Sequence, residues 1–75
     1  MPKDKYTYEL QELGKKIRYY RKRNKLTQVD LEVRSGINHG DISRIESGQK
    51  NIELYTIVKL AEALEVELYD LFKRK

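Results

Sequence analysis

Apolar residues recur every three or four positions along almost the whole chain, which is the spacing of one face of an α-helix. The single proline is at position 2, so it interrupts none of this pattern. No strand-like alternation is evident, and no low-complexity linker divides the 75 residues. The sequence therefore predicts a compact all-α fold in one domain over residues 1–75.

Five helices joined by short turns are predicted. Their expected ranges are 7–24, 27–36, 38–47, 54–64 and 66–72. An apolar stripe steps by three and four residues along the first helix and consists of Tyr6, Leu10, Leu13, Ile17 and Tyr20. A chain this short buries a small core, so oligomerisation is expected to contribute to its stability.

Residues 27–48 carry the clearest local signals. Thr27 and Asn38 are of the types that cap helix N-termini, and each precedes by three positions an aspartate, Asp30 or Asp41, in the capping-box position. Gly36 can adopt the left-handed conformation that ends a helix. Two short helices joined by a glycine-containing turn predict a helix-turn-helix motif, in which the second helix lies in the major groove of DNA.

The second helix of this motif has two different faces. Ile37, Ile42 and Ile45 are expected to anchor it on the core. Its other face is polar and free to point outward, and it carries Asn38, His39, Gly40, Asp41, Ser43 and Arg44.

The charge is unevenly distributed. Residues 1–50 carry 12 basic and 7 acidic side chains, whereas residues 51–75 carry 4 and 5. This segregation fits a surface that meets a polyanion, although an ordinary solvated helix face remains the alternative. The densest basic run is Lys15, Lys16, Arg18, Arg21, Lys22, Arg23 and Lys25, and shorter basic segments are expected as an arm at 1–6 and a tail at 73–75.

Several classes of function are disfavoured. The chain has no cysteine and one histidine, so no metal site and no cofactor are predicted. No nucleophile–histidine arrangement, paired carboxylates or phosphate-binding glycine loop points to an enzyme. No apolar run is long enough to span a membrane, and a cytoplasmic location is expected.

Three strings resemble the small helix-turn-helix repressors of the Cro and phage-repressor type, the xenobiotic-response-element family. They are LGKKIRYYRKRNKLTQ, SGI…ISRIESGQKNI and IVKLAEALEVELYDLF, in the family's order and spacing. The resemblance implies a five-helix, lambda-repressor-like domain that regulates transcription by binding double-stranded DNA. Ile52, where many members have proline, slightly favours the controller proteins of restriction–modification systems. Glu32 stands where the family favours alanine, so it must bend outward or find a cation.

The resemblance also implies site residues. Arg21 and Glu46 match a pair that commonly forms a buried salt bridge, and Gln28 matches a glutamine that holds a DNA phosphate. The implied DNA-binding residues are Thr27, Gln28, Asn38, His39, Gly40, Asp41, Ser43, Arg44, Lys50 and Asn51.

Individual roles stay open among these residues. Arg44 can read guanine in the major groove, or pair with Asp41 one turn earlier. His39 can donate to a base or a phosphate, or be merely solvated. Asp41 can cap its helix or accept from cytosine N4, and capping is favoured because its charge repels phosphate.

A homodimer on a palindromic operator is predicted from an apolar surplus near the C-terminus. The expected interface residues are Tyr55, Val66, Leu68, Tyr69, Leu71 and Phe72. The alternative is a protein-interaction module of the same fold, such as an antitoxin that neutralises a partner toxin.

Overall fold

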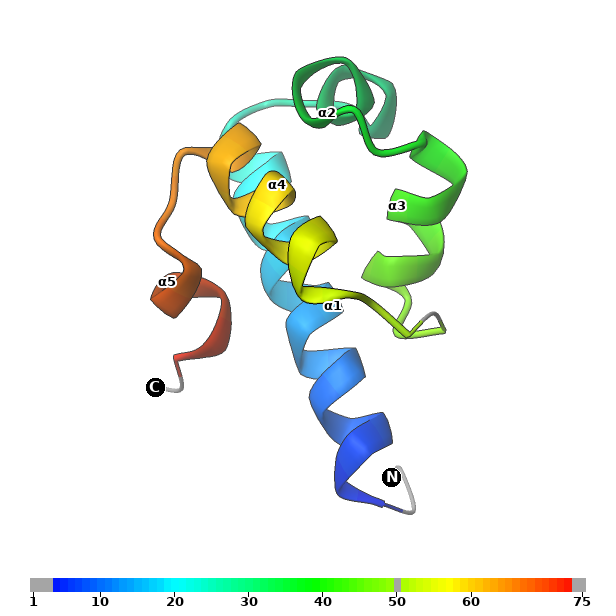
Figure 1. The fold of residues 1–75 in the computed structure, drawn as a ribbon. Coiled ribbons are helices and arrows are strands. Elements are labelled where there is room, and N and C mark those ends of the chain that lie inside the picture. The colour runs from blue at the N-terminus through cyan, green and yellow to red at the C-terminus, as the bar shows by residue number, and fades with distance from the viewer. Residues whose placement is uncertain (1–3, 50, 74–75) are drawn as a thin grey trace.

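The computed structural model describes residues 4–49 and 51–73, which form five α-helices and no strand (Figure 1). They are α1 (Lys5–Arg23), α2 (Gln28–Ser35), α3 (His39–Glu46), α4 (Leu54–Leu64) and α5 (Leu68–Phe72). The predicted all-α fold class is confirmed. None of the helices in this part of the chain has the length and apolar character needed to cross a lipid bilayer.

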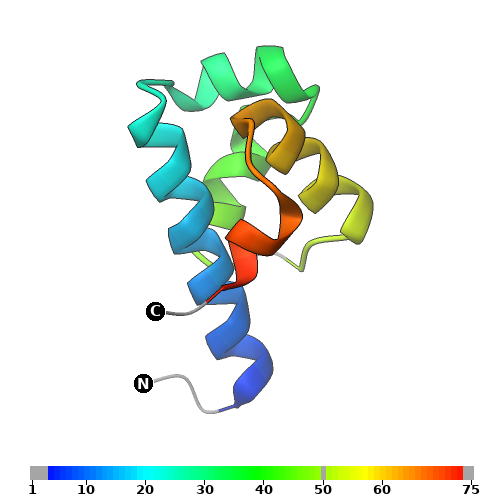
Figure 2. The ribbon, with the colours of Figure 1, turned by 90° about the vertical axis from the view of Figure 1, so that its left-hand side faces the viewer.

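The longest helix, α1, is the element on which three of the other helices pack. It packs against α3, α4 and α5, while α2 packs on α3 and α4 (Figures 1 and 2). Figure 2 shows α5 beside α1, whereas α2 crosses the end of the domain. This arrangement leaves α2 and α3 together at one side.

The start of α1 differs from the prediction. The side chain of Asp4 accepts a 2.8 Å hydrogen bond from the backbone N–H of Thr7, so the helix begins at Lys5, two residues earlier than expected. Tyr6 is 57% exposed and does not continue the buried stripe. The predicted basic arm at 1–6 is therefore wrong for residues 5 and 6, which are helical, and residues 1–3 lie outside the described residues.

The boundaries of α2 follow the predicted caps. Thr27 and Asp30 form both bonds of a capping box, at 2.9 Å and 2.8 Å. Gly36 ends the helix with φ at +79°, a left-handed conformation that side chains disfavour. The cap of α3 differs in detail, because the Asn38 side chain accepts from Gly40 N, at 2.7 Å, and not from Asp41.

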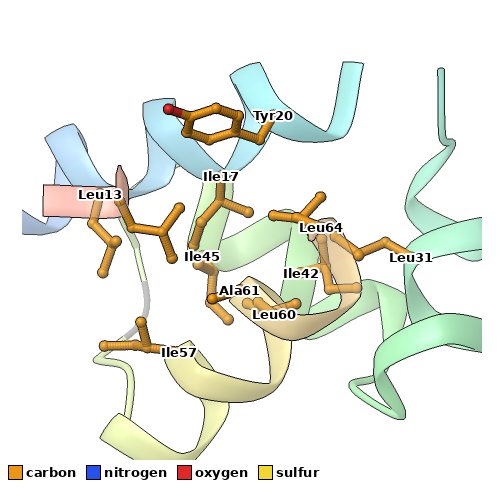
Figure 3. Close-up of a cluster of buried hydrophobic side chains, with 11 residues drawn as sticks. Leu13, Ile17, Tyr20, Leu31, Ile42, Ile45, Ile57, Leu60, Ala61 and Leu64 are labelled. Atoms are coloured by element: carbon orange, nitrogen blue, oxygen red, sulfur yellow. The ribbon is translucent and has the colours of Figure 1, made fainter. Parts of the chain in front are cut away.

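One core joins all five helices (Figure 3). It consists of Leu13, Ile17, Tyr20, Leu31, Ile42, Ile45, Ile57, Leu60, Ala61, Leu64 and Leu71. The prediction that Leu71 lies in a dimer interface is wrong, because its side chain is 1% exposed and belongs to this core. The fifth helix begins at Leu68, two residues later than expected, and its start is held by the Asp70 side chain, which accepts from the backbone N–H of Glu67 at 3.0 Å.

An ion pair inside the domain ties α1 to α3. Arg21 donates to both carboxylate oxygens of Glu46, at 2.6 and 3.0 Å, and to the carbonyl oxygen of Leu26 at 2.8 Å. The side chains of Arg21 and Glu46 are 9% and 3% exposed. The hydrogen bond from Arg21 to Glu46 raises the pKa of the guanidinium, while burial opposes the rise. The predicted pairing of these two residues is thus observed.

The helices α1 and α3 also approach each other closely at Gly14. A β-carbon at this position would lie 2.6 Å from the carbonyl oxygen of Glu46 and still nearer that of Ile45. Both oxygens belong to the backbone of α3, so glycine allows an approach that no other residue permits.

Candidate nucleic-acid interface

The outward face of α3 is built as the sequence predicts. Ile42 and Ile45 are 0% and 2% exposed, so they fix the helix on the core from one side. On the opposite side, the side chains of His39 and Arg44 are each 56% exposed, and Ser43 is exposed as well. The helix therefore presents donors and acceptors to solvent while its anchoring residues stay buried.

The first turn of α3 is held by side-chain oxygens from before the helix. Besides the cap from Asn38, Glu32 on α2 accepts from the backbone N–H of His39 at 3.1 Å. Gly40 gives the capping side chain room over this turn. A β-carbon at Gly40 would lie only 3.0 Å from the side-chain oxygen of Asn38, and 3.9 Å from the guanidinium of Arg44. The guanidinium of Arg44 lies back over the first turn, close to Gly40 and Asp41.

Arg44 makes the pairing that was one of its two predicted roles. Its Nη2 donates to Asp41 at 2.8 Å, and the two side chains are 56% and 36% exposed. An exposed ion pair one turn apart contributes little free energy, so the same guanidinium can exchange it for a base edge at small cost. The pairing is compatible with base contact by Arg44.

Gln28 lies where α2 meets α3. Its side-chain amide donates to Glu46 at 3.2 Å, on the same carboxylate that Arg21 holds. The amide oxygen of Gln28 therefore has its orientation fixed by the buried ion pair. Thr27, the residue before Gln28, caps the helix. Its hydroxyl oxygen accepts from the backbone N–H of Asp30.

A shallow hollow beside Gln28 carries several cations of the basic run, for which the sequence left a solvated helix face as the alternative. It is lined by Arg18, Arg21, Lys22, Lys25, Leu26, Thr27, Gln28, Val29 and His39. Arg18 and Lys22 are four residues apart and so share one face of α1. Their spacing, together with their place just before the motif, was the signal that could have assigned them to this side of the domain.

Asn51 lies at the other end of the same surface. Together with Asp41, Ile52, Glu53 and Thr56 it lines a second hollow, so Asn51 is brought near the first turn of α3. Lys50, the other predicted residue of this loop, lies outside the described residues.

Glu32 bends outward, one of the two outcomes expected for it, and contacts the ring of His39. Its Oε1 lies 2.7 Å from Nδ1 of His39, and the Glu32 side chain is 37% exposed. The hydrogen bonds from the ring and then the backbone of His39 lower the pKa of Glu32. The close crossing of α2 and α3 is therefore kept with a glutamate that points outward.

The residues predicted for the dimer surface differ in how exposed they are. Tyr55, Tyr69 and Phe72 are 67%, 70% and 45% exposed, whereas Val66 and Leu68 pack half-buried against the core. Three of the six side chains predicted for the interface are thus exposed in a single chain.

The comparisons with known proteins agree with this geometry. The helix-turn-helix family model matches residues 17–71. The repressor RghR of Bacillus subtilis is 40% identical over 58 residues, which cover 76% of this chain and 43% of RghR. The control protein C.SmaI of Serratia marcescens is 33% identical over 63 residues, covering 84% of this chain and 75% of C.SmaI.

A solved structure is also similar. The restriction-modification controller protein C.AhdI of Aeromonas hydrophila matches with a TM-score of 0.84 and 35% identity, covering 87% of this chain and 98% of C.AhdI. The chain spans less than half the length of some curated relatives, including RghR and the Bacillus subtilis regulator SlrR. From its fold, its motif and these relatives, the chain belongs to the xenobiotic-response-element type of helix-turn-helix DNA-binding transcriptional regulators.

Proposed function

We propose that the chain acts as a symmetric dimer that binds a palindromic DNA operator with α3 in the major groove. The observation that carries the proposal is the exposed polar face of α3 above Ile42 and Ile45, which are buried. An α-helix with its side chains is about 10–12 Å across, and the major groove is about 12 Å wide, so the helix fits it closely.

The sequence-reading residues are those on this face. Arg44 exchanges Asp41 for a guanine, whose O6 and N7 accept two hydrogen bonds from a guanidinium. His39, Gly40 and Ser43 lie on the same outward face, and the small size of Gly40 lets the helix approach the bases.

The phosphate contacts lie on either side of α3. On one side, Gln28 is oriented by Glu46, and Arg18, Lys22 and Lys25 lie beside it in the same hollow. On the other side, Asn51 lies near the first turn of α3, followed by α4. Cations near the duplex backbone strengthen binding to any sequence, whereas contacts to base edges select one.

The dimer uses the surface near the C-terminus. Tyr55, Tyr69 and Phe72 supply its exposed apolar area, with Val66 and Leu68 at the edge of the core. To bind two half-sites one turn of B-DNA apart, the dimer must hold its two α3 helices about 34 Å apart.

Selection of bound fragments from random duplex DNA tests DNA reading. A palindromic consensus is expected, and affinity should fall log-linearly with salt, with a slope of about −0.9 for each phosphate contacted. Arg44→Ala should reduce discrimination between consensus and random duplex by about 5- to 150-fold. Lys15→Ala removes the same charge from a side chain that is 73% exposed on α1, outside the hollow beside Gln28, and should leave discrimination unchanged.

Sedimentation equilibrium tests the dimer. Tyr69→Asp places a charge in the proposed interface and should yield a monomer. Tyr6→Asp, on another exposed tyrosine that lies on α1, should not. A wild-type monomer at high micromolar concentration contradicts the dimer. Binding to a protein partner with little dependence on salt, and none to duplex DNA, would favour the antitoxin-like alternative.

A further inference from the structure

The pair formed by Glu32 and His39 bridges the two helices of the motif. A single oxygen, Oε1 of Glu32, receives both the backbone N–H of His39 at 3.1 Å and the ring Nδ1 at 2.7 Å. Because α2 carries the carboxylate and α3 begins at His39, these contacts fix the imidazole relative to both helices.

The contact determines which ring nitrogen carries the proton. An ionised carboxylate only accepts hydrogen bonds, and the lowered pKa of Glu32 keeps it ionised. Nδ1 must therefore be the donor. In the neutral imidazole one nitrogen donates and the other accepts, so Nε2 is left as an acceptor.

An acceptor on α3 selects particular partners in a duplex. In the major groove the donors are the amino groups of adenine N6 and cytosine N4, whereas guanine O6 and N7 and thymine O4 are acceptors. Phosphate oxygens are acceptors too, so a neutral Nε2 is not attracted to the DNA backbone. The nearby cations Arg18, Lys22 and Lys25 line the same hollow as His39 and can serve the phosphates instead.

We propose that Glu32 is a positioning residue that holds His39 in the Nδ1–H tautomer, so that the ring selects base pairs presenting an amino group. The inference rests on the proposed function, since it requires α3 to lie in the major groove. It makes a residue on α2, outside the outward face of α3, a determinant of operator preference.

Nitrogen-15 NMR of the free protein tests the tautomer directly. His39 is the one histidine of the chain, so its two ring nitrogens give unambiguous signals. At alkaline pH, where the ring is neutral, the wild-type spectrum should show the proton on Nδ1. Glu32→Ala should shift the ring toward the Nε2–H form, and Glu62→Ala, which removes an exposed carboxylate from α4, should leave the wild-type pattern.

Selection from random duplex DNA at the same pH tests the consequence. Glu32→Ala should reduce the preference for adenine or cytosine at one position of each half-site by about 2- to 10-fold, the value of one hydrogen bond. His39→Ala should produce the same loss at the same position and no further loss when combined with Glu32→Ala. Circular dichroism of each variant checks that the helices are retained.

The outcomes separate the two ideas. A wild-type chain that ignores duplex DNA overturns the proposed function and this inference together. A wild-type chain that binds an operator overturns the inference alone if its ring carries the proton on Nε2, or if Glu32→Ala leaves base preference unchanged.

Discussion

Removing the carboxylate of Glu46 is the most demanding test of how the motif is held in place. In Glu46→Ala the guanidinium of Arg21 stays buried but loses both bonds to the carboxylate, and Gln28 loses its acceptor. Of the hydrogen bonds described above for the guanidinium, the one to the carbonyl oxygen of Leu26 remains. Leaving one partner of a buried pair uncompensated costs about 3–5 kcal/mol.

That cost is large for a chain of this size. At about 0.05–0.15 kcal/mol per residue, 75 residues have a free energy of unfolding of about 4–11 kcal/mol. Urea unfolding followed by circular dichroism, with a slope of about 1 kcal/mol per molar, should show a midpoint lowered by about 3 M or more. The loss should persist in concentrated salt, because buried charges are poorly screened.

Two further variants make the reasoning refutable. The double substitution Arg21→Met with Glu46→Leu removes both charges and should be close to the wild type in stability or above it. Glu62→Ala breaks an exposed pair with Lys59 on α4 and should change stability by less than about 0.5 kcal/mol. A cost below about 1 kcal/mol for Glu46→Ala would show that Arg21 finds water or another acceptor, and would refute the argument.

Three other predictions concern stability. Gly14→Ala should lower the free energy of unfolding by about 2 kcal/mol or more, because the added methyl group meets the backbone of α3. Lys15→Ala, on the outer face of α1, should not lower it, and equal urea midpoints for the two variants would contradict this prediction. Thr27→Ala should cost about 1 kcal/mol by the same assay through loss of the α2 cap, and an unchanged midpoint would show that water replaces it. Hydrogen bonds from the backbone N–H groups of Thr7, Thr27 and Glu67 lower the pKa of Asp4, Asp30 and Asp70 in the folded chain. The stabilisation from these bonds is therefore complete above the ordinary aspartate pKa and disappears as pH falls through the lowered values. In thermal unfolding between about pH 6 and 2, Asp30→Asn should lose less stability with falling pH than the wild type.

The signals that predicted the fold are local and strong. The capping box of Thr27 and Asp30 and the left-handed Gly36 are set by a few neighbouring residues, so the bounds of α2 follow from the sequence. The spacing of Ile42 and Ile45 likewise determines which face of α3 is buried. The ion pair between Arg21 and Glu46, in contrast, was implied by family resemblance, since no local pattern joins residues 25 positions apart.

The parts that escaped prediction depend on tertiary packing or on weak caps. Leu71 looks like surplus apolar surface in the sequence, but α5 turns back on α1 and buries it. The start of α1 is set by Asp4, which accepts from the N–H of Thr7, and the apolar spacing alone predicts a later start. The sequence predicts that Glu32 bends outward or pairs with a cation, but its contact with His39 becomes evident only when α2 and α3 are placed together.

The division of α3 into an anchored side and an outward side also bears on how such proteins diversify. Ile42, Ile45 and Glu46 hold the helix, and none of them is on the face that carries His39, Ser43 and Arg44. Substitutions on that face can therefore accumulate without loss of the residues that hold α3 in place. Under the proposed function, exchange of a few surface side chains would then be enough to change the DNA sequence that is bound. The contact between Glu32 and His39 couples one position outside this face to it. A substitution at residue 39 is therefore expected to be accompanied by one at residue 32.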